Sequence, residues 1–178
     1  EPQLAFAALQ NENICRISLP HGGILLVGEQ SRLPAYDAAA EYAWQRHEIE
    51  SGYPWIADAS REAAVAQMLN QHTIGGVHFK KGCYPGQEVV ARSQFRGQVK
   101  RRGYLVHAAQ ALAAHAEVLD AQGQGCGQVA MAAAHPAGGF DAIVSVQTQA
   151  AEGEAQAGPL RVGEQSLTLL PLPYTHAT

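Results

Sequence analysis

The stretch from Lys80 to Glu88, KKGCYPGQE, contains the residues of this 178-residue chain that are best suited to thiol chemistry. Pro85 suits the first turn of a helix, where its missing N–H costs nothing, so the sequence predicts that Cys83 lies at a helix entrance. Unpaired N–H groups at such an entrance, together with nearby Lys81, favour a negative charge and would lower the pKa of the thiol. On this interpretation, Cys83 and Lys81 would be catalytic residues.

A second interpretation of the same stretch is purely structural. The glycines and the proline around Cys83 can form a strand-to-helix turn, with the cysteine as a small buried hydrophobe, because most free cysteines are buried and unreactive. No general base can be assigned beside the thiol, since the neighbouring His78 lies five residues upstream. The residues alone leave both interpretations open.

Glu50, in the segment HEIESGYP, is the second candidate for a functional side chain. A carboxylate at the C-terminal end of a helix is disfavoured by the helix dipole unless another group requires it there. A carboxylate can accept two parallel hydrogen bonds from the amino-amide edge of a pterin or a guanine. The alternative is an exposed helical glutamate that binds no ligand.

The cysteines and histidines show no metal-binding spacing. Cys15, Cys83 and Cys126 form no C-x-x-C pair, and their odd number and wide spacing argue against a disulfide framework and for a reducing compartment. None of the eight histidines belongs to an H-E-x-x-H pattern. We therefore expect no metal site, histidines that lie at the surface or form local hydrogen bonds, and a cytoplasmic location.

The segment from Lys80 to Arg102 is strongly basic. It contains seven lysines and arginines and one glutamate, a net charge of +6, whereas the whole chain has a net charge of −4. Such a segment can steer an anion to one place, or it can be a solvated face with local ion pairs. Only Tyr84 and Phe95 could stack on bases, which makes RNA a weaker candidate for the anion.

Length and composition are typical of a folded globular protein. Hydrophobic residues make up 47% of the chain and charged residues 16%, a balance that disordered chains do not have. No run approaches the roughly 18 apolar residues of a transmembrane helix, so we predict no membrane segment. The first residue is not Met, and we expect a processed protein or a fragment of a longer one.

The elements that position these residues can be predicted from hydrophobic periodicity and turn residues. Two apolar runs separated by Pro-His-Gly-Gly predict a β-hairpin over 13–28. Helices are predicted over 35–51, 61–69 and 85–95. Beyond residue 98, segments typical of strands alternate with Gly, Asp and Pro turns and predict a small antiparallel barrel or sandwich. These segments are 101–108, 116–134, 140–148 and 165–173.

Taken together, the motifs resemble those of YgfZ-type proteins. These proteins are folate-binding relatives of the glycine-cleavage aminomethyltransferase that support iron–sulfur enzymes and tRNA modification. The resemblance is carried by five segments in the order that the family shows. They are IESGYP (49–54), QMLN (67–70), GGV (75–77), KGCYPGQEVVAR (81–92) and LPLPY (170–174).

The resemblance implies an α+β fold class with two parts. Residues 1–97 would be the C-terminal part of an aminomethyltransferase-like folate-binding α/β region, and residues 98–178 a small antiparallel β-barrel. The implied cofactor is tetrahydrofolate or a derivative, with Glu50 as the acid that contacts the pterin. The resemblance also implies that the N-terminal half of the protein, which supplies much of the pocket, is missing from this chain or separate. Further residues expected at the cofactor are Arg92, Tyr84 and Gln87.

The function implied is that of a tetrahydrofolate-binding accessory protein for iron–sulfur enzyme assembly or repair and for tRNA modification. Iron–sulfur enzymes would be its client partners, and Cys83 would act as a thiol in transfer, redox or cluster handling. A folate-dependent aminomethyltransferase is one alternative, although the cysteine at the helix entrance argues against glycine cleavage. An RNA-binding module that uses residues 80–102 is another. Whether the protein is an enzyme stays open.

Overall fold

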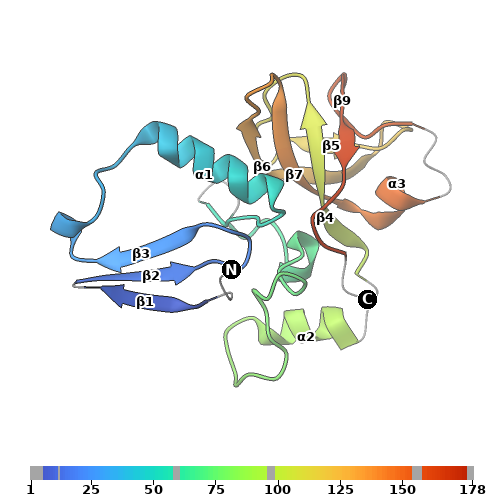
Figure 1. Cartoon of the computed structure of the whole chain (residues 1–178). Helices are drawn as coiled ribbons and strands as arrows, with labels where there is room; N and C mark the ends of the chain where they lie inside the picture. Colours follow the sequence, from blue (N-terminus) through green and yellow to red (C-terminus); the bar gives the residue numbers. More distant parts are fainter. Residues whose placement is uncertain (1–5, 12, 58–60, 96–98, 154–157, 176–178) are drawn as a thin grey trace. The chain divides into compact units, whose positions relative to one another are not determined.

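The computed structural model describes residues 6–11, 13–57, 61–95, 99–153 and 158–175 (Figure 1). The chain divides into two compact units, Glu1–Tyr42 and Ala43–Thr178. This division falls between Tyr42 and Ala43 and does not test the domain boundary expected near residue 98, which stays a prediction. None of the helices in the described part of the chain has the length and apolar content needed to span a membrane.

Unit Glu1–Tyr42 contains a three-stranded antiparallel sheet in the order β1-β2-β3. The hairpin predicted over 13–28 is confirmed as β2 and β3, with Cys15 opposite Val27. Its turn contains Gly22 and Gly23 at φ values of 92° and 84°, which glycine adopts at no steric cost. Strand β1 was not predicted, because its four exposed residues carry no apolar alternation. The elements are β1 (Ala8–Asn11), β2 (Ile14–Ser18), β3 (Ile24–Gly28) and the 3-10 helix η1 (Gln30–Arg32).

Helix α1 (Ala38–Glu50) confirms the helix predicted over 35–51, with a later start. Asp37 explains the start, because its side-chain oxygen Oδ1 accepts a hydrogen bond from the backbone N–H of Ala39 at 2.9 Å. An aspartate in this position satisfies one of the N–H groups that a helix leaves unpaired at its beginning. Residues 35 and 36 therefore precede the helix.

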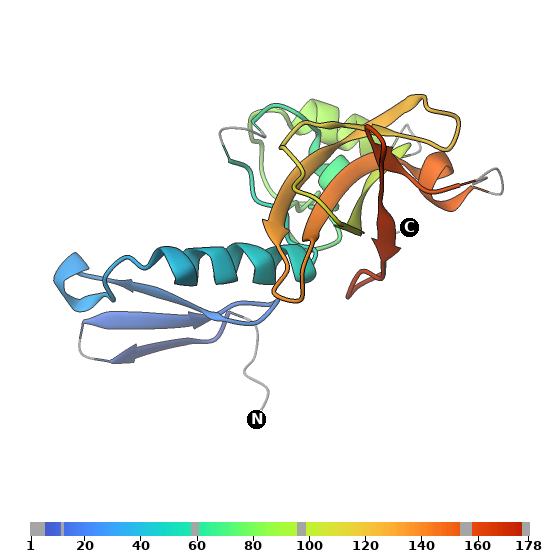
Figure 2. The same ribbon diagram turned by 90° about the horizontal axis from the view of Figure 1, so that it is seen from above.

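Unit Ala43–Thr178 contains a seven-stranded sheet in the order β10-β4-β7-β6-β5-β8-β9, and every pair in it is antiparallel. The two edge strands, β9 and β10, are separated in the chain by Leu167 alone, so the sheet curves until it nearly closes (Figures 1 and 2). The predicted antiparallel barrel is confirmed in this form. Its elements are β4 (Arg101–Ala108), β5 (Glu117–Leu119), β6 (Gly125–Ala134), β7 (Phe140–Gln147), α3 (Thr148–Glu152), β8 (Arg161–Val162), β9 (Gln165–Ser166) and β10 (Thr168–Leu170).

The central strands β4 and β7 are buried on both faces. Val106 and Val144 belong to the core cluster inside the barrel, whereas the adjacent Leu105 and Ile143 pack in a second cluster with Ile49 of α1. Successive side chains of a strand point to opposite faces, so both faces must be covered. Ile49, Ala64 and Leu69 pack on the outer face, all of them from the part of unit Ala43–Thr178 that precedes the barrel.

Two short elements connect α1 to the barrel, the 3-10 helix η3 (Ala66–Leu69) and helix α2 (Gln87–Phe95). The helix predicted over 61–69 is reduced to the single turn η3, and the helix predicted over 85–95 begins at residue 87. Three buried or half-buried polar contacts attach η3 to its neighbours. They are Gln67 Nε2 to Val90 O at 2.6 Å, Ser145 Oγ to Met68 O at 2.9 Å, and Asn70 Nδ2 to Gly103 O at 2.8 Å.

Candidate functional site

The segment 81–92 forms the loop before α2 and the first part of that helix. The backbone N–H of Tyr84 donates to Gln87 Oε1 at 3.2 Å, and the N–H of Gln87 donates to the carbonyl oxygen of Tyr84, also at 3.2 Å. The second of these bonds closes a β-turn over residues 84–87, in which Gly86 has a φ of 80°, so Tyr84 precedes the helix and does not cap it. Cys83 therefore lies in the loop before α2, four residues before Gln87, the first residue of that helix.

The thiol of Cys83 is exposed, so it does not pack beneath the turn as an inert hydrophobe. Next to it, the ammonium of Lys81 lies 4.5 Å from the centre of the Tyr84 ring. A cation over an aromatic face is attracted by the ring's quadrupole, which holds Lys81 within the same loop. The loop thus presents one thiol and one positive charge to solvent.

We predict a large difference in reactivity between two of the cysteines. Cys126 is 2% exposed, its thiol donates to the carbonyl oxygen of Val118, and burial raises the pKa of that thiol. In a Cys15→Ser background, native Cys83 should react with a thiol-specific disulfide reagent on the order of a hundred-fold or more faster than Cys126. Stopped-flow absorbance measures both phases. A fast phase that survives Cys83→Ser would contradict the exposed position of this thiol.

Arg92 is the sixth residue of α2 and borders an open depression of about 290 Å³ on that helix. Its Nη2 lies 2.6 Å from Oε1 of Glu88, and these two side chains are 67% and 81% exposed. An exposed pair with this spacing contributes only about 0.3–0.5 kcal/mol, so the guanidinium can exchange Glu88 for another anion. Phe95 completes the depression and meets Phe79 edge to face at 6.0 Å.

Glu50, the last residue of α1, lies apart from these residues. Its carboxylate is 3.5 Å from Nε of Arg46, and one of its oxygens lies close to His135 and Asp141. Figure 2 shows the end of α1 beside the β6–β7 hairpin and α2 well separated from it. The structure therefore groups most of the predicted site residues at α2 and places Glu50 elsewhere in the unit. The group at α2 is Lys81, Cys83, Tyr84, Gln87 and Arg92.

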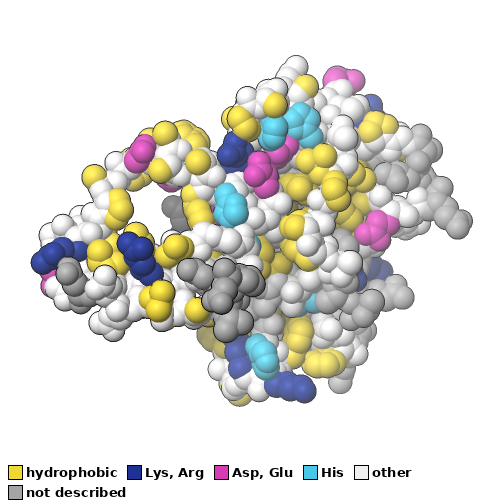
Figure 3. Space-filling view, viewed as in Figure 1, with side chains coloured by type: hydrophobic (Ala, Val, Ile, Leu, Met, Phe, Trp, Pro, Cys, Tyr) yellow, Lys and Arg dark blue, Asp and Glu magenta, His cyan; other side chains and the backbone are white. Residues whose placement is uncertain are grey.

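Asp141 is the centre of a histidine–carboxylate cluster that sequence reasoning did not find. It is buried, and its Oδ1 lies 2.7 Å from Nδ1 of His107, its partner on the opposite strand. Its Oδ2 lies 4.0 Å from Nε2 of His135, and the two imidazole rings meet edge to face at 5.9 Å. Figure 3 shows histidine and acidic side chains side by side on this face. The cluster brings together residues far apart in the sequence, so no linear spacing marks it.

Glu48, two residues before Glu50, is the buried acid of α1, with 2% of its surface exposed. Burial raises the pKa of its carboxyl group, and hydrogen bonds with the Trp55 and Trp44 side chains oppose that shift. The sequence signal was a tryptophan four residues before the acid, a spacing that places both on one helix face. The predicted site residue, Glu50, is exposed, whereas Glu48 is the buried carboxylate of this helix.

A Glu48→Gln substitution tests this burial through pH. Because the pKa of Glu48 is raised in the folded state, the stability that the protonated carboxyl contributes is complete below the ordinary glutamate pKa of 4.5, and it is lost as pH rises through the folded-state pKa. Glutamine keeps an acceptor for an indole N–H without the charge. We expect the variant to gain stability relative to the natural chain between pH 5 and pH 8, measured by urea unfolding with circular dichroism. The exposed Glu164→Gln is the control, and an unchanged difference would disprove the assignment.

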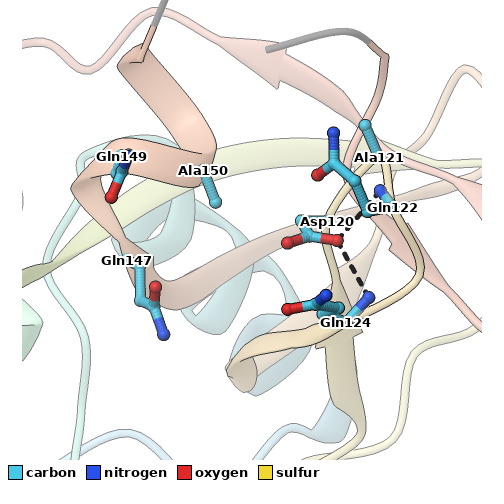
Figure 4. A pocket seen from close by; sticks show the side chains of 7 residues that line it. All are labelled: Asp120, Ala121, Gln122, Gln124, Gln147, Gln149 and Ala150. Atoms are coloured by element: carbon cyan, nitrogen blue, oxygen red, sulfur yellow. Dashed lines mark hydrogen bonds between the residues drawn. The ribbon is translucent and has the colours of Figure 1, made fainter. Parts of the chain in front are cut away.

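A polar pocket of about 250 Å³ lies on the barrel, away from all predicted site residues (Figure 4). Within it, Oδ1 of Asp120 accepts hydrogen bonds from the backbone N–H groups of Gln122 at 3.0 Å and Gln124 at 2.8 Å. The carboxylate thus holds the turn between β5 and β6, which is a structural role. The lining residues are Asp120, Ala121, Gln122, Gln124, Gln147, Gln149 and Ala150.

Comparison with known proteins finds similarity over part of the chain, although no family model matches it. The tRNA-modifying protein YgfZ of Vibrio atlanticus is 43% identical over 70 residues, which are 39% of this chain and 22% of that protein. The tRNA-modifying protein YgfZ of Escherichia coli is 46% identical over 63 residues, 35% of this chain and 19% of that protein. The match thus spans about a fifth of the length of these relatives. The predicted resemblance to YgfZ-type proteins is confirmed over this part of the chain.

Proposed function

We propose that this chain is part of a YgfZ-type protein that binds tetrahydrofolate and supports tRNA modification and the assembly or repair of iron–sulfur enzymes. The observation that carries the proposal is the exposed thiol of Cys83 in the loop before α2, inside the motif that resembles those proteins. The relatives' name, tRNA-modifying protein, supports the tRNA part. The proposal includes a cytoplasmic location and an aminomethyltransferase-like fold for the folate-binding region.

In this proposal, Cys83 is the reacting thiol and Lys81 supplies positive charge beside it. Folate is an elongated molecule with a pterin at one end and glutamate carboxylates at the other. Glu50 suits the amino-amide edge of the pterin, because a carboxylate can accept two parallel hydrogen bonds. Arg92 suits the glutamate carboxylates, because its bond to Glu88 is exposed and weak. The rest of the pocket would come from the remainder of the protein, with Tyr84 and Gln87 at the near wall.

The test is an anaerobic titration of the complete protein that carries this chain with tetrahydrofolate, followed by tryptophan fluorescence. We expect saturable binding that Glu50→Gln and Arg92→Gln each weaken about tenfold or more, the usual loss when a charged hydrogen-bond partner is removed. Glu164→Gln is the matched control and should bind as the natural protein does. Absence of binding, or binding that neither substitution changes, would overturn the folate site. Turnover of a bound one-carbon folate would instead favour the transferase alternative.

Direct contact with RNA is a second candidate function, favoured by the relatives' name and by three exposed lysines, Lys80, Lys81 and Lys100. Lysines that neutralise phosphates release counterions, so affinity for tRNA should fall steeply with added salt. We expect Lys80→Glu with Lys100→Glu to weaken binding and to flatten the salt dependence. Binding that is absent at low salt, or insensitive to salt, would rule this function out.

A further inference from the structure

We propose that Glu50, His135 and Asp141 form a binding site for one divalent metal ion of the zinc class. The three residues come from the end of α1, the end of the β6–β7 hairpin next to β6, and strand β7, all within unit Ala43–Thr178. The inference goes beyond the proposed function. It uses the same Glu50 carboxylate, so a metal bound there would take the place of the pterin contact, and Arg92→Gln, which concerns folate alone, distinguishes the two proposals.

The geometry of the three side chains is close to that of a metal site. One ligand atom from each residue lies within 4.8 Å of the other two, and the pair formed by His135 Nε2 and Asp141 Oδ2 is 4.0 Å apart. With metal bonds of about 2.1 Å, two ligands of a tetrahedral ion lie about 3.4 Å apart. The side chains therefore need to close by only a fraction of their present separation. Glu50 can do this, because it is exposed and ends its helix.

His107 acts as a positioning residue for Asp141. Its Nδ1 holds Oδ1 of Asp141 at 2.7 Å, and the other carboxylate oxygen, Oδ2, is the one nearer to His135. Metal-binding carboxylates are commonly held in this way by a second residue. The hairpin backbone also packs tightly on the His107 ring, since a Cβ on Gly139 would lie 2.6 Å from its Nε2. The ring thus has little freedom to leave Asp141.

The charges around the site favour a cation. Arg46 is the side chain that would compete with a metal ion for Glu50. Two carboxylates, one of them buried, lie together beside the imidazoles of His107 and His135. A buried carboxylate is costly unless a positive charge or hydrogen bonds compensate it. In the metal-free chain, Arg46 supplies positive charge at 3.5 Å from Glu50. A bound metal would displace this guanidinium, so removal of Arg46 should strengthen metal binding.

The ring of His135 has one nitrogen on the backbone and the other on the site. The backbone N–H of Ala137 donates to Nδ1 of His135 at 3.2 Å, so in the neutral ring the hydrogen is on Nε2. A metal on Nε2 requires the hydrogen on Nδ1, and the exposed N–H of Ala137 would then hydrogen-bond with water.

The donor set selects the class of ion. One imidazole nitrogen with two carboxylate oxygens suits Zn²⁺ and Co²⁺, whereas Mg²⁺ and Ca²⁺ prefer oxygen ligands alone. Three protein ligands leave one position for water or an exogenous group. An ion held there would join the end of α1 to the hairpin of the barrel, and it would stabilise the unit through binding to the folded state.

The test measures Co²⁺ and Zn²⁺ binding by the full chain, with Cys15 and Cys83 replaced by serine so that accessible thiols take no metal. After chelator treatment, we expect one ion per chain, detected by competition with a chromophoric chelator and by the Co²⁺ absorption spectrum. Binding should be lost in Asp141→Asn and His135→Gln and weakened roughly tenfold in His107→Gln. It should be unchanged in His115→Asn, which removes an exposed imidazole at a left-handed position, φ 64°, that asparagine tolerates.

Two further variants guard against loss of folding. Glu50→Gln changes an exposed residue at a helix end and should abolish or strongly weaken binding while the metal-free melting temperature stays the same. Arg46→Gln should tighten binding several-fold, which a simple ion-pair cluster would not explain. Absence of saturable Zn²⁺ binding, or binding that persists in both Asp141→Asn and His135→Gln, would overturn the site.

Discussion

An Asn70→Ala substitution is expected to destabilise unit Ala43–Thr178 by about 4 kcal/mol. Asn70 is 1% exposed, its Nδ2 donates to the carbonyl oxygen of Gly103 at 2.8 Å, and its Oδ1 accepts from the Gly103 N–H at 3.1 Å. Alanine leaves both backbone groups of β4 buried without these partners. Alanine must also adopt the left-handed φ of 57°. This conformation is less favourable for alanine than for glycine by roughly 1 kcal/mol of free energy.

Two other variants separate the parts of this effect. Asn70→Gly keeps the left-handed backbone and should be about 1 kcal/mol more stable than Asn70→Ala. Tyr174→Phe removes one hydroxyl that accepts from Asn70 Nδ2 and donates to Gly52 O, and should cost about 1–2 kcal/mol. Urea unfolding followed by tryptophan fluorescence measures all three, with the exposed Gln122→Ala as control. A loss within about 0.5 kcal/mol of that control would show that Asn70 does not hold η3 to the barrel.

The second large effect is expected at Gly127, in the middle of the barrel sheet. A Cβ there would lie 2.6 Å from Cα of Val146 and closer still to the carbonyl oxygen of Ser145. Both are backbone atoms of β7, so the clash cannot be relieved by a side-chain rotation. We expect Gly127→Ala to cost at least about 3 kcal/mol, the upper range for overpacking a core, or to prevent folding.

Gly125, two residues earlier on the same strand, provides the matched control. A Cβ on Gly125 would meet the carboxylate oxygen of Glu117, the far end of an exposed and flexible side chain. Gly125→Ala should therefore cost less than about 1 kcal/mol. Comparing soluble yield and melting temperature of the two variants measures the difference. Equal stability of both would show that β6 and β7 are not as close at Gly127 as the structure has them.

Local sequence patterns were sufficient to predict the elements that are determined by neighbouring residues. The hairpin over 13–28 was predictable, because its apolar runs and its glycine turn are adjacent in the chain. The strands β4 and β7 were predictable for a related reason. Burial on both faces requires nearly continuous apolar residues, as in 101–108 and 140–148, and such runs are recognisable without a partner.

Features that depend on distant contacts could not be predicted. The helix expected over 61–69 is one turn, because η3 makes its contacts through Gln67 and Asn70 with partners far away in the sequence. Buried Glu48 has a hydrogen-bond partner, Trp55, that lies beyond the end of the helix. The cluster at Asp141 joins residues separated by as many as 91 positions, so the expected absence of a metal site rested on linear spacing alone.

The role of Cys83 is tested most directly by the content of modified nucleosides in tRNA, measured by mass spectrometry. The host is a bacterium that lacks its own YgfZ and expresses the complete protein that carries this chain. We predict that the natural protein and a Cys15→Ser variant restore the modified nucleosides. Cys83→Ser should leave them at the level of the deletion strain while accumulating to the same amount. Equal restoration by Cys83→Ser would contradict a function for this thiol.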